Sequence, residues 1–526
     1  MQFSLRTKVI LFGLLVILGV VFRYPVVPHE IGHDSFLVHA FANSISERGY
    51  ASWWFHPLSI AGFYPLSEVS AVPFMLSGIQ QCTGTDLETP ILIYCMFLGL
   101  FSIFTSYLMA GALWDNDAFK FLVAFCFSAS QGVLTFTSMT VPARGLFVML
   151  TPLFIYFLLK SRKFLARCGI LALILFLLLF TTHHMVFFLI LVISAYFIVL
   201  VGIVLKNLLE RNGYARAIER YVPLFPVVGF AVMYSIPIFT GHFLESSRYD
   251  WYLVLSSYAR YAGILTVIFA LGGLTYLVFK GRKSFGEWFL LSTVIFLTAI
   301  IYQVTYMKWF MPIVMVLLVG VSLVNVSRLK GKRLGLYVVT IFLISLVAFS
   351  GFYQFLHTYR ESPYSKRYME DSTFSAALYM KEYSNGSSIA NERWCGRRML
   401  AVSNSRIFIE YGVLSNVQGF TSIKDFEYEI FPITSDEFWL DVYHMKKSPA
   451  EGYWDSILRS EYEDLIKRDW YNERFNLTYI IENTRTHGNL FWHHGLRPSK
   501  LLSSIYKDKS CIYDNGNVNI WFLKEM

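Results

Sequence analysis

The sequence is poor in charged residues, and its few cysteines do not have the spacing of a metal site. Only 15% of its 526 residues are charged, whereas 55% are hydrophobic and the mean hydropathy is +0.48. So much apolar surface excludes an ordinary soluble fold and indicates that lipid is the main solvent of the chain. Of the six cysteines, Cys395 and Cys511 fall in the more polar last region and are candidates for a disulfide in an oxidising compartment.

The chain also lacks a basic stripe of the kind that binds nucleic acid. Its formal net charge is +9, but the Lys and Arg residues form short clusters between apolar runs, which indicates membrane topology and no nucleic-acid partner. No small-residue cleavage site follows the first apolar run, residues 9–22. We therefore expect this run to be a retained helix and not a removed signal peptide.

Apolar runs of the length that crosses a bilayer recur along the first two thirds of the sequence. A spanning helix needs about 20 mostly apolar residues, and roughly eleven candidates meet that requirement. They centre near residues 15, 101, 128, 152, 176, 196, 231, 270, 296, 318 and 344.

Basic clusters between these runs predict the orientation of the chain. An eleven-helix count places five clusters on one side, which the positive-inside rule makes the cytoplasm. They are Arg6 and Lys8; Lys160, Arg162, Lys163 and Arg167; Lys206, Arg211, Arg216 and Arg220; Lys280, Arg282 and Lys283; and Arg328, Lys330, Lys332 and Arg333. The N-terminus is then cytoplasmic in a multi-pass protein of the cell (plasma) membrane. The turns near Pro142, His183, Arg248 and Lys308 are then external.

The predicted fold class is a polytopic α-helical membrane protein with a C-terminal soluble α/β domain. Residues 1–356 form the membrane domain, which includes a first external loop at 23–89, and residues 357–526 form an extracytoplasmic domain. This last region holds alternating runs such as LTYIIEN and NVNIWFL, which are typical of strands. We also expect a helix at residues 374–383, short strands in SSIA and RIFI, and a turn at Asn515-Gly516.

The first external loop is the segment richest in chemistry. A loop of about 65 residues, in a chain whose other loops are mostly short, is more often functional than a passive connector. Ionisable groups crowd its start, directly after the first helix: His29, Glu30, His33, Asp34 and His39.

This loop resembles that of the GT-C-fold, polyprenyl-phosphate-dependent glycosyltransferases, which include archaeal oligosaccharyltransferases and protein mannosyltransferases. The matching stretches are HDSFLVHAFANSISERG and FYPLSEVSAVPFMLSGIQQCTGTDLE. TVPARGL, TTHH and MKWFMP also resemble archaeal members, as do ALYMKEY, YIIENTR and IYDNGNVNIWFLK in the tail. The WWDYG motif of oligosaccharyltransferases has no convincing counterpart, and RWCG at 393–396 is only a faint echo of it.

The resemblance implies a GT-C-like fold and inverting transfer of a sugar from a polyprenyl-linked donor to a protein, lipid or glycan acceptor. It makes Asp34 the catalytic acid or, with a diphosphate donor, a ligand of Mg²⁺ or Mn²⁺. Glu30 and His33 are then its partners. His39 is a candidate substrate-binding residue, and it stands one position later than the histidine of many relatives, where this chain has Val38.

Physical reasoning about the reaction adds further candidates. A departing lipid phosphate needs cations, which Arg144 and Lys308 at external helix ends could supply. Snorkelling of these side chains to lipid headgroups explains them equally well. His183 and His184 are an unusual ionisable pair at an external membrane boundary and are candidate substrate-binding residues, although an interfacial structural role is also open.

Two alternative functions stay open, and one metal-binding motif is discounted. A transporter or lipid-binding scaffold, with the first loop binding headgroups, is the alternative from another class. A zinc metalloprotease is a minor alternative, because His29, Glu30 and His33 match HExxH; Pro28 and Gly32 argue against a helix there. Asp115-Asn116-Asp117 resembles a metal-binding DxD motif but is predicted to be a polar cytoplasmic turn.

Overall fold

The computed structural model describes residues 2–25, 27–63, 67–211, 224–239, 251–301, 304–328, 332–359, 368–390, 393–409, 413–420, 476–484 and 509–523. Arg216, Arg220, Arg248 and Lys330 lie outside these residues. Contacts along the chain divide it into two units, which we describe separately. Unit 1 is Met1–Val26, Leu92–Met139 and Arg144–Arg360; unit 2 is Val27–Ile91, Thr140–Ala143 and Glu361–Met526. The first loop therefore belongs to the same unit as the C-terminal segment.

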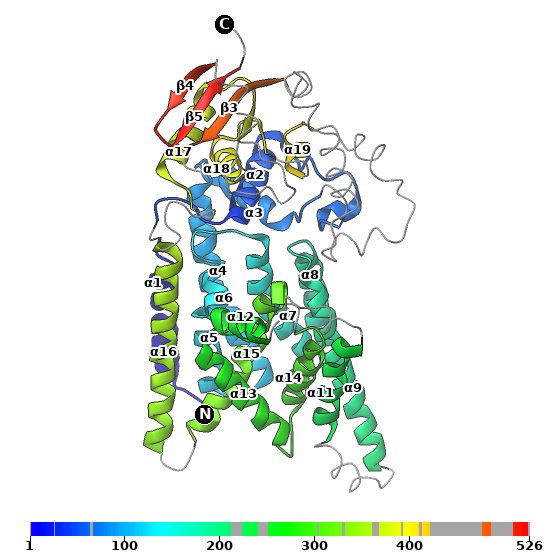
Figure 1. Ribbon diagram of the computed structural model, residues 1–526. Helices are drawn as coiled ribbons and strands as arrows, with labels where there is room; N and C mark the ends of the chain where they lie inside the picture. Colours follow the sequence, from blue (N-terminus) through cyan, green and yellow to red (C-terminus); the bar gives the residue numbers. More distant parts are fainter. Residues whose placement is uncertain are drawn as a thin grey trace. The chain divides into compact units, whose positions relative to one another are not determined.

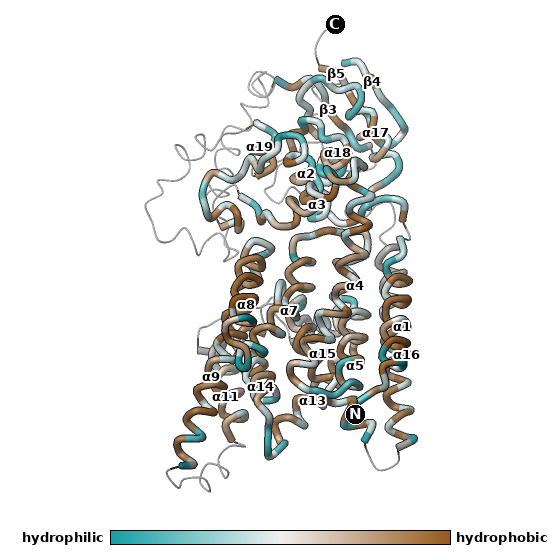
Figure 2. Tube along the Cα trace, turned by 180° about the vertical axis from the view of Figure 1, so that it is seen from behind, coloured by the Kyte–Doolittle hydropathy of each residue, from teal (hydrophilic) through white to brown (hydrophobic). Residues whose placement is uncertain are grey.

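Unit 1 is built of apolar helices (Figure 1). They are α1 (Leu5–Arg23), most of α4 (Glu88–Leu113), α5 (Asp117–Ser128), α6 (Gln131–Leu134), α7 (Ala143–Ser161), α8 (Leu165–Phe180), α9 (Val186–Arg211), α11 (Leu224–Phe239), α12 (Trp251–Ala262), α13 (Ile264–Phe279), α14 (Phe285–Thr298), α15 (Val304–Val326) and α16 (Lys332–Tyr359). Long apolar side chains on α8 and α9 are exposed in the isolated chain, and both helices are brown over most of their length in Figure 2. Such faces suit contact with lipid tails.

Six helices in the described part of the chain are long and apolar enough to cross a membrane, or up to seven if the bent pair α12 and α13 counts as one span. The six include the predicted centres at 15, 101, 152, 196, 318 and 344, and the bent pair includes 270. The centres at 176, 231 and 296 fall in shorter apolar helices, and residue 128 ends a helix of only 12 residues. The multi-helix character is confirmed, whereas the count of eleven spans stays a prediction.

Three of the basic clusters meet at one end of unit 1. Lys8 Nζ lies 2.9 Å from Asp117 Oδ2, in the turn that also holds Trp114. Lys280 Nζ lies 5.6 Å from the centre of the Trp114 ring, and Arg162 lies 4.6 Å from that of Phe285, which follows the 280–283 cluster. Positive charge thus collects at a single end of the helices, as the topology argument requires.

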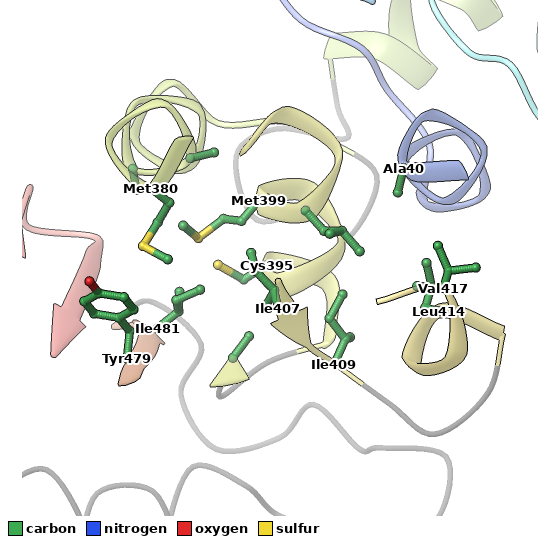
Figure 3. Packing of buried hydrophobic residues seen from close by; sticks show 14 of the residues in the cluster. Ala40, Met380, Cys395, Met399, Ile407, Ile409, Leu414, Val417, Tyr479 and Ile481 are labelled. Atoms are coloured by element: carbon green, nitrogen blue, oxygen red, sulfur yellow. The ribbon is translucent and has the colours of Figure 1, made fainter. Parts of the chain in front are cut away.

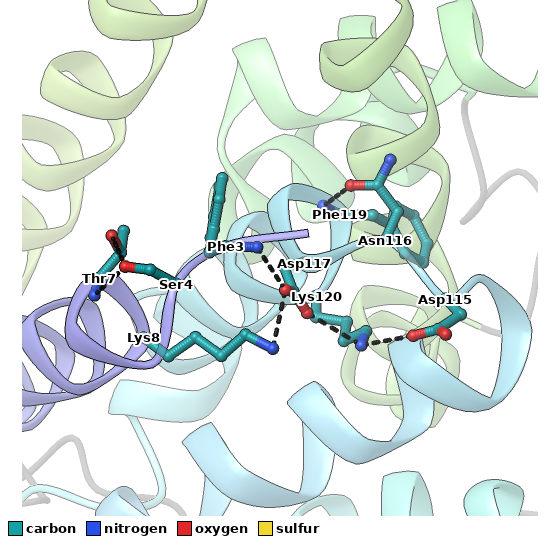
Figure 4. Close-up of polar contacts among 9 residues, drawn as sticks. All are labelled: Phe3, Ser4, Thr7, Lys8, Asp115, Asn116, Asp117, Phe119 and Lys120. Carbon is teal, nitrogen blue, oxygen red and sulfur yellow. Dashed lines mark hydrogen bonds and ion pairs between the residues drawn. The ribbon is translucent and has the colours of Figure 1, made fainter. Parts of the chain in front are cut away.

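The DxD-like segment is a structural turn at this basic end (Figure 4). Asn116 caps α5 by accepting a hydrogen bond from the Phe119 N–H. Asp117 accepts from the Phe3 N–H at 2.8 Å and pairs with Lys8 and Lys120, while Asp115 pairs with Lys120. The two aspartates therefore join helix ends to one another.

Unit 2 contains a mixed sheet flanked by helices. Its helices are α2 (His33–Arg48), the short η1 (Pro57–Ile60), α3 (Ala71–Thr83), α17 (Asp371–Tyr383), α18 (Arg393–Ser403) and α19 (Val413–Val417). The strands are β1 (Ser387–Ala390), β2 (Ile407–Phe408), β3 (Leu477–Asn483), β4 (Ser510–Asp514) and β5 (Val518–Phe522). Their order is β2-β1-β3-β5-β4, with β1 parallel to β2 and β3, and β5 antiparallel to β3 and β4. The expected helix, strands and Asn515-Gly516 turn are present.

One apolar core joins the first-loop helix α2 to the C-terminal helices and sheet. Ala40 and Phe41 of α2 lie in the same buried cluster as Met380, Met399 and Ile481, and Figure 3 labels several of its members. Burial of each large apolar side chain contributes about 1.5–3 kcal/mol. Asn43 Nδ2 adds a hydrogen bond to the Ala401 carbonyl. The C-terminal segment thereby fixes the helix that carries Asp34.

The candidate disulfide is not formed in this structure. Cys395 is buried in the core of unit 2, whereas Cys511 is exposed on β4, and neither thiol is in a disulfide. The two candidates do not pair in this structure, because Cys395 of helix α18 is buried in the core and Cys511 is exposed.

Candidate functional site

The predicted acid lies on a sharp corner at the start of α2. Gly32 has a φ of +103°, and a Cβ there would lie 2.8 Å from Thr140 Oγ1, so only glycine suits this position. The helix begins at the next residue, and Asp34 is in its first turn, where the helix dipole favours an anionic side chain. His33 Nε2 lies 3.0 Å from Asp34 Oδ1, and both side chains are about one third exposed. Asp34 is therefore accessible and paired with His33.

Glu30 and His39 form a second, buried pair beside this corner. His39 Nδ1 lies 2.6 Å from Glu30 Oε2, and the two residues are 4% and 1% exposed. Glu30 Oε1 has no hydrogen-bond partner among the described residues. The structure thus separates the predicted residues: Asp34 and His33 reach the surface, whereas Glu30 and His39 face each other inside unit 2.

His29 does not act with His33 as a metal-binding pair. Its Nδ1 lies 3.2 Å from Glu88 Oε1, its Nε2 lies 3.4 Å from Asp371 Oδ1, and its ring stacks on Phe374. Because the helix starts only at residue 33, His29 and His33 are not one helical turn apart. The HExxH geometry of the metalloprotease alternative is therefore contradicted.

A residue that the sequence left aside lies next to the candidate acid. The Trp394 ring of the RWCG stretch packs edge-on against His33, with ring centres 4.9 Å apart. Arg397, one turn later on α18, lies 5.3 Å from the centre of the Trp394 ring. The weak similarity of residues 393–396 to the WWDYG motif was a sequence signal for this region. The contact between His33 and Trp394, more than 350 residues apart, could not be inferred from it.

In unit 1, the two predicted phosphate-binding cations share one aromatic cluster. Arg144 lies 5.8 Å from the centre of the Phe136 ring, and Lys308 Nζ lies 5.3 Å from that of Trp309. The Phe136 and Trp309 rings are themselves in contact, with centres 4.6 Å apart. Tyr261 also packs on Trp309 and lies under Lys308. Tertiary structure therefore brings together side chains that are far apart in the sequence.

The histidine pair joins the same group. The His184 and Tyr306 rings lie 4.5 Å apart, which connects the turn before α9 to the first turn of α15. Burial and, to a smaller extent, nearby Arg144 lower the pKa of His184 to about 4. Burial, His184 and Arg144 together lower the pKa of His183 well below its usual value. Both rings are therefore neutral near pH 7 and can offer hydrogen bonds but no charge. Since His183 Nδ1 accepts from the Met185 N–H, we infer that its hydrogen is on Nε2.

Three helices begin at this group. Arg144 is the second residue of α7, His183 and His184 immediately precede α9, and Lys308 is near the start of α15. The N-terminal end of a helix carries a partial positive charge and unpaired N–H groups. Two fixed cations, neutral histidines and three such ends form a site that suits an anion such as a phosphate. We refer to Arg144, His183, His184 and Lys308 as the cationic group.

Comparison with solved structures identifies the fold as that of the GT-C, polyprenyl-phosphate-dependent glycosyltransferases. The oligosaccharyltransferase of Archaeoglobus fulgidus matches with a TM-score of 0.57 and 12% identity, over 99% of this chain and 74% of that one, in a structure tethered to an acceptor peptide. The archaeal oligosaccharyltransferase AglB from the same organism, in complex with an inhibitory peptide and a dolichol-phosphate, matches with a TM-score of 0.56 and 12% identity, over 99% of this chain and 75% of that one.

A second protein shares the fold over its whole length. ArnT from Cupriavidus metallidurans, bound to undecaprenyl phosphate, matches with a TM-score of 0.55 and 11% identity, over 99% of both chains. No protein-family model matches this chain, and no curated protein matches it by sequence. At these identities the comparisons establish the fold.

The described side chains do not by themselves form a metal site. Among the residues with assigned positions, no group of three or more His, Cys, Asp or Glu is arranged to hold an ion. Asp34 and His33 supply only two neighbouring donors. These two donors alone do not fit a bound Mg²⁺ or Mn²⁺.

Proposed function

We propose that this chain is a membrane glycosyltransferase. It transfers a sugar or glycan from a polyprenyl (dolichyl) phosphate or diphosphate donor to a protein, lipid or glycan acceptor on the outer face of the membrane. The observation that carries the proposal is the cationic group, which assembles at three helix N-termini in a chain with the GT-C fold. AglB in complex with a dolichol-phosphate and ArnT bound to undecaprenyl phosphate share this fold.

The cationic group is proposed to bind the phosphate of the donor. Arg144 supplies a planar pair of donors for two phosphate oxygens, and Lys308 supplies a point charge. Negative charge builds up on this phosphate as the bond between it and the sugar breaks. Fixed cations and helix ends stabilise that charge more in the transition state than in the bound donor.

Asp34 is proposed to act on the acceptor. Its carboxylate takes the proton from the acceptor hydroxyl or amide while the acceptor oxygen or nitrogen forms a bond to the anomeric carbon of the sugar. The bond between this carbon and the lipid phosphate breaks at the same time, and the phosphate leaves with the bonding electrons. Attack opposite the leaving group inverts the anomeric centre. His33, whose Nε2 lies 3.0 Å from Asp34 Oδ1, orients the carboxylate.

Transfer of radiolabelled sugar from extracted polyprenyl-linked donors tests this function. Asp34→Asn removes the base while keeping the side-chain size, so transfer is expected to fall about 100-fold or more. The assay is run with and without divalent metal, and a requirement for metal would favour a diphosphate donor. Equal turnover by wild type and Asp34→Asn would refute the assignment of Asp34. Donor binding without turnover by wild type would favour a lipid-binding scaffold.

The donor site has its own test in binding of polyprenyl phosphate to the purified protein. Arg144→Ala is expected to weaken binding about 10- to 100-fold, because it removes a charge-assisted contact. Arg162→Ala is the matched control, since Arg162 also packs over a phenylalanine ring but lies at the basic end. Equal affinities for the two variants would contradict the site.

A further inference from the structure

The buried Glu30–His39 pair suggests a role that its sequence position did not reveal. Next to residues proposed to meet substrate, a carboxylate and an imidazole would be expected to face solvent. Both are instead buried, and each is the other's hydrogen-bond partner at 2.6 Å. Burying a carboxylate and an imidazole costs free energy unless they form hydrogen bonds. The hydrogen bond between Glu30 and His39 therefore holds the two segments that carry them in a fixed relation.

These two segments are the two sides of the Gly32 corner. Glu30 lies two residues before Gly32, and His39 is in the second turn of α2, so their bond folds the incoming chain against the helix. The N-terminus of α2 has no side-chain cap at Gly32. Because glycine has no side chain, residue 32 itself forms no side-chain contact that could hold the corner.

Further contacts hold the same corner from outside. Ile31 forms an antiparallel bridge with Tyr368, whose carbonyl accepts a hydrogen bond from Arg398 Nη1 at 2.7 Å. Ser35 Oγ accepts from the Val141 N–H at 2.7 Å. Between Ile31 and Ser35 are only Gly32, His33 and Asp34. The direction of the His33 and Asp34 side chains therefore depends on the corner.

We propose that Glu30 and His39 are positioning residues: their hydrogen bond holds the Gly32 corner so that His33 and Asp34 point toward the acceptor. This inference rests on the proposed function for its catalytic consequence. It assigns to Glu30 a structural hydrogen bond and no proton transfer with substrate. It also removes His39 from the surface that contacts substrate.

Two substitutions at residue 30 separate this role from direct catalysis. Glu30→Ala removes the bond, and kcat is expected to fall about 10- to 100-fold with the donor KM changed less than about twofold, because small misplacements of a catalytic group are costly. Glu30→Gln keeps an oxygen that accepts from His39 Nδ1–H, so kcat is expected to stay within about threefold of wild type. Equal damage by Gln and Ala would overturn the proposal.

Hydrogen–deuterium exchange of the full-length protein gives a readout that does not need turnover. Glu30→Ala is expected to speed exchange at residues 33–39 at least about tenfold and to leave α17 unchanged. Met380→Ala, which removes a buried side chain from the same core, is the control for general loss of stability. Unchanged exchange at residues 33–39 in Glu30→Ala would overturn the positioning role even if wild type transfers no sugar. Local acceleration with no transfer by wild type would overturn the proposed function alone.

Discussion

Arg23 shows how one buried side chain can dictate its neighbours. It is 1% exposed at the end of α1, and its guanidinium donates to Thr137 Oγ1, the Gly19 carbonyl and the Ser128 carbonyl. Gly99 of α4 leaves the space that this side chain occupies, and a Cβ there would overlap Arg23 Nε and Cδ. Three hydrogen bonds prevent the side chain from moving aside.

We therefore expect Gly99→Ala to destabilise unit 1 by about 1–3 kcal/mol, the usual cost of overpacking. Gly13→Ala is the control, because a Cβ at Gly13 meets nothing within 4 Å and alanine favours the α1 helix. Thermal unfolding midpoints in detergent compare the two variants with wild type. A midpoint for Gly99→Ala at or above that of Gly13→Ala would contradict this explanation.

Glu68 in the first loop makes the stability of unit 2 depend on pH. Burial raises the pKa of Glu68 to about 7, against the opposing effects of the Val69 amide and Arg397. An unfolded glutamate has a pKa of about 4.3, so the folded state binds the proton more tightly. This contribution to stability is present below pH about 4 and is lost as the pH rises to about 7.

Glu68→Gln removes this titration. We expect its unfolding midpoint, relative to wild type, to be higher at pH 8 than at pH 5. Asp86→Asn, which removes a largely exposed carboxylate from the same unit, should shift the midpoint equally at both pH values. The same relative midpoint for Glu68→Gln at pH 5 and pH 8 would show that Glu68 titrates normally.

At the scale of elements, Asp117 joins the start of α5 to the start of α1. Its side chain is fully buried and pairs with Lys8 and Lys120 (Figure 4). Asp117→Asn is expected to cost about 2–4 kcal/mol of unfolding free energy, because it leaves lysines without a buried counter-charge. Asp115→Asn, at a side chain 79% exposed, is expected to cost less than about 1 kcal/mol. Denaturant unfolding measures both, and equal losses would contradict the account of this turn.

At the scale of the whole molecule, unit 1 has two chemically different ends. Arg144 of the cationic group is near the start of helix α7 and Lys160 of the basic end is near its end, about 24 Å away at 1.5 Å per residue. Helix α15 likewise begins near Lys308 and ends just before Arg328. The basic end is expected to face the cytoplasm and the cationic group to face outward.

Labelling of intact cells with a membrane-impermeant thiol reagent tests this orientation. The exposed Cys511 of unit 2 is expected to react, and Cys511→Ser to lose that labelled site. A cysteine placed at the basic end, in Arg282→Cys combined with Cys82→Ser and Cys511→Ser to remove the exposed native thiols, should react only after the cells are permeabilised. Reaction of Arg282→Cys in intact cells would reverse the predicted topology.

Local patterns in the sequence determined the membrane character, several helix centres, the strands of the tail and the individual candidates at 34, 144, 183, 184 and 308. Hydrophobic length, basic clusters and turn residues act over a few neighbouring positions, so they can be read without the fold. The limits of the same patterns are visible near residue 128, where an apolar run is divided between α5 and α6 and is not one long helix.

Only the tertiary structure decided which candidates share a surface. Glu30 and His33 look equivalent in the sequence, yet the φ of +103° at Gly32 turns one into the core and leaves the other beside Asp34 and Trp394. Arg144, His184 and Lys308 meet because packing of α7, α9 and α15 brings their N-terminal ends together. Burial and contact depend on residues hundreds of positions apart, and that information is not contained in any local pattern.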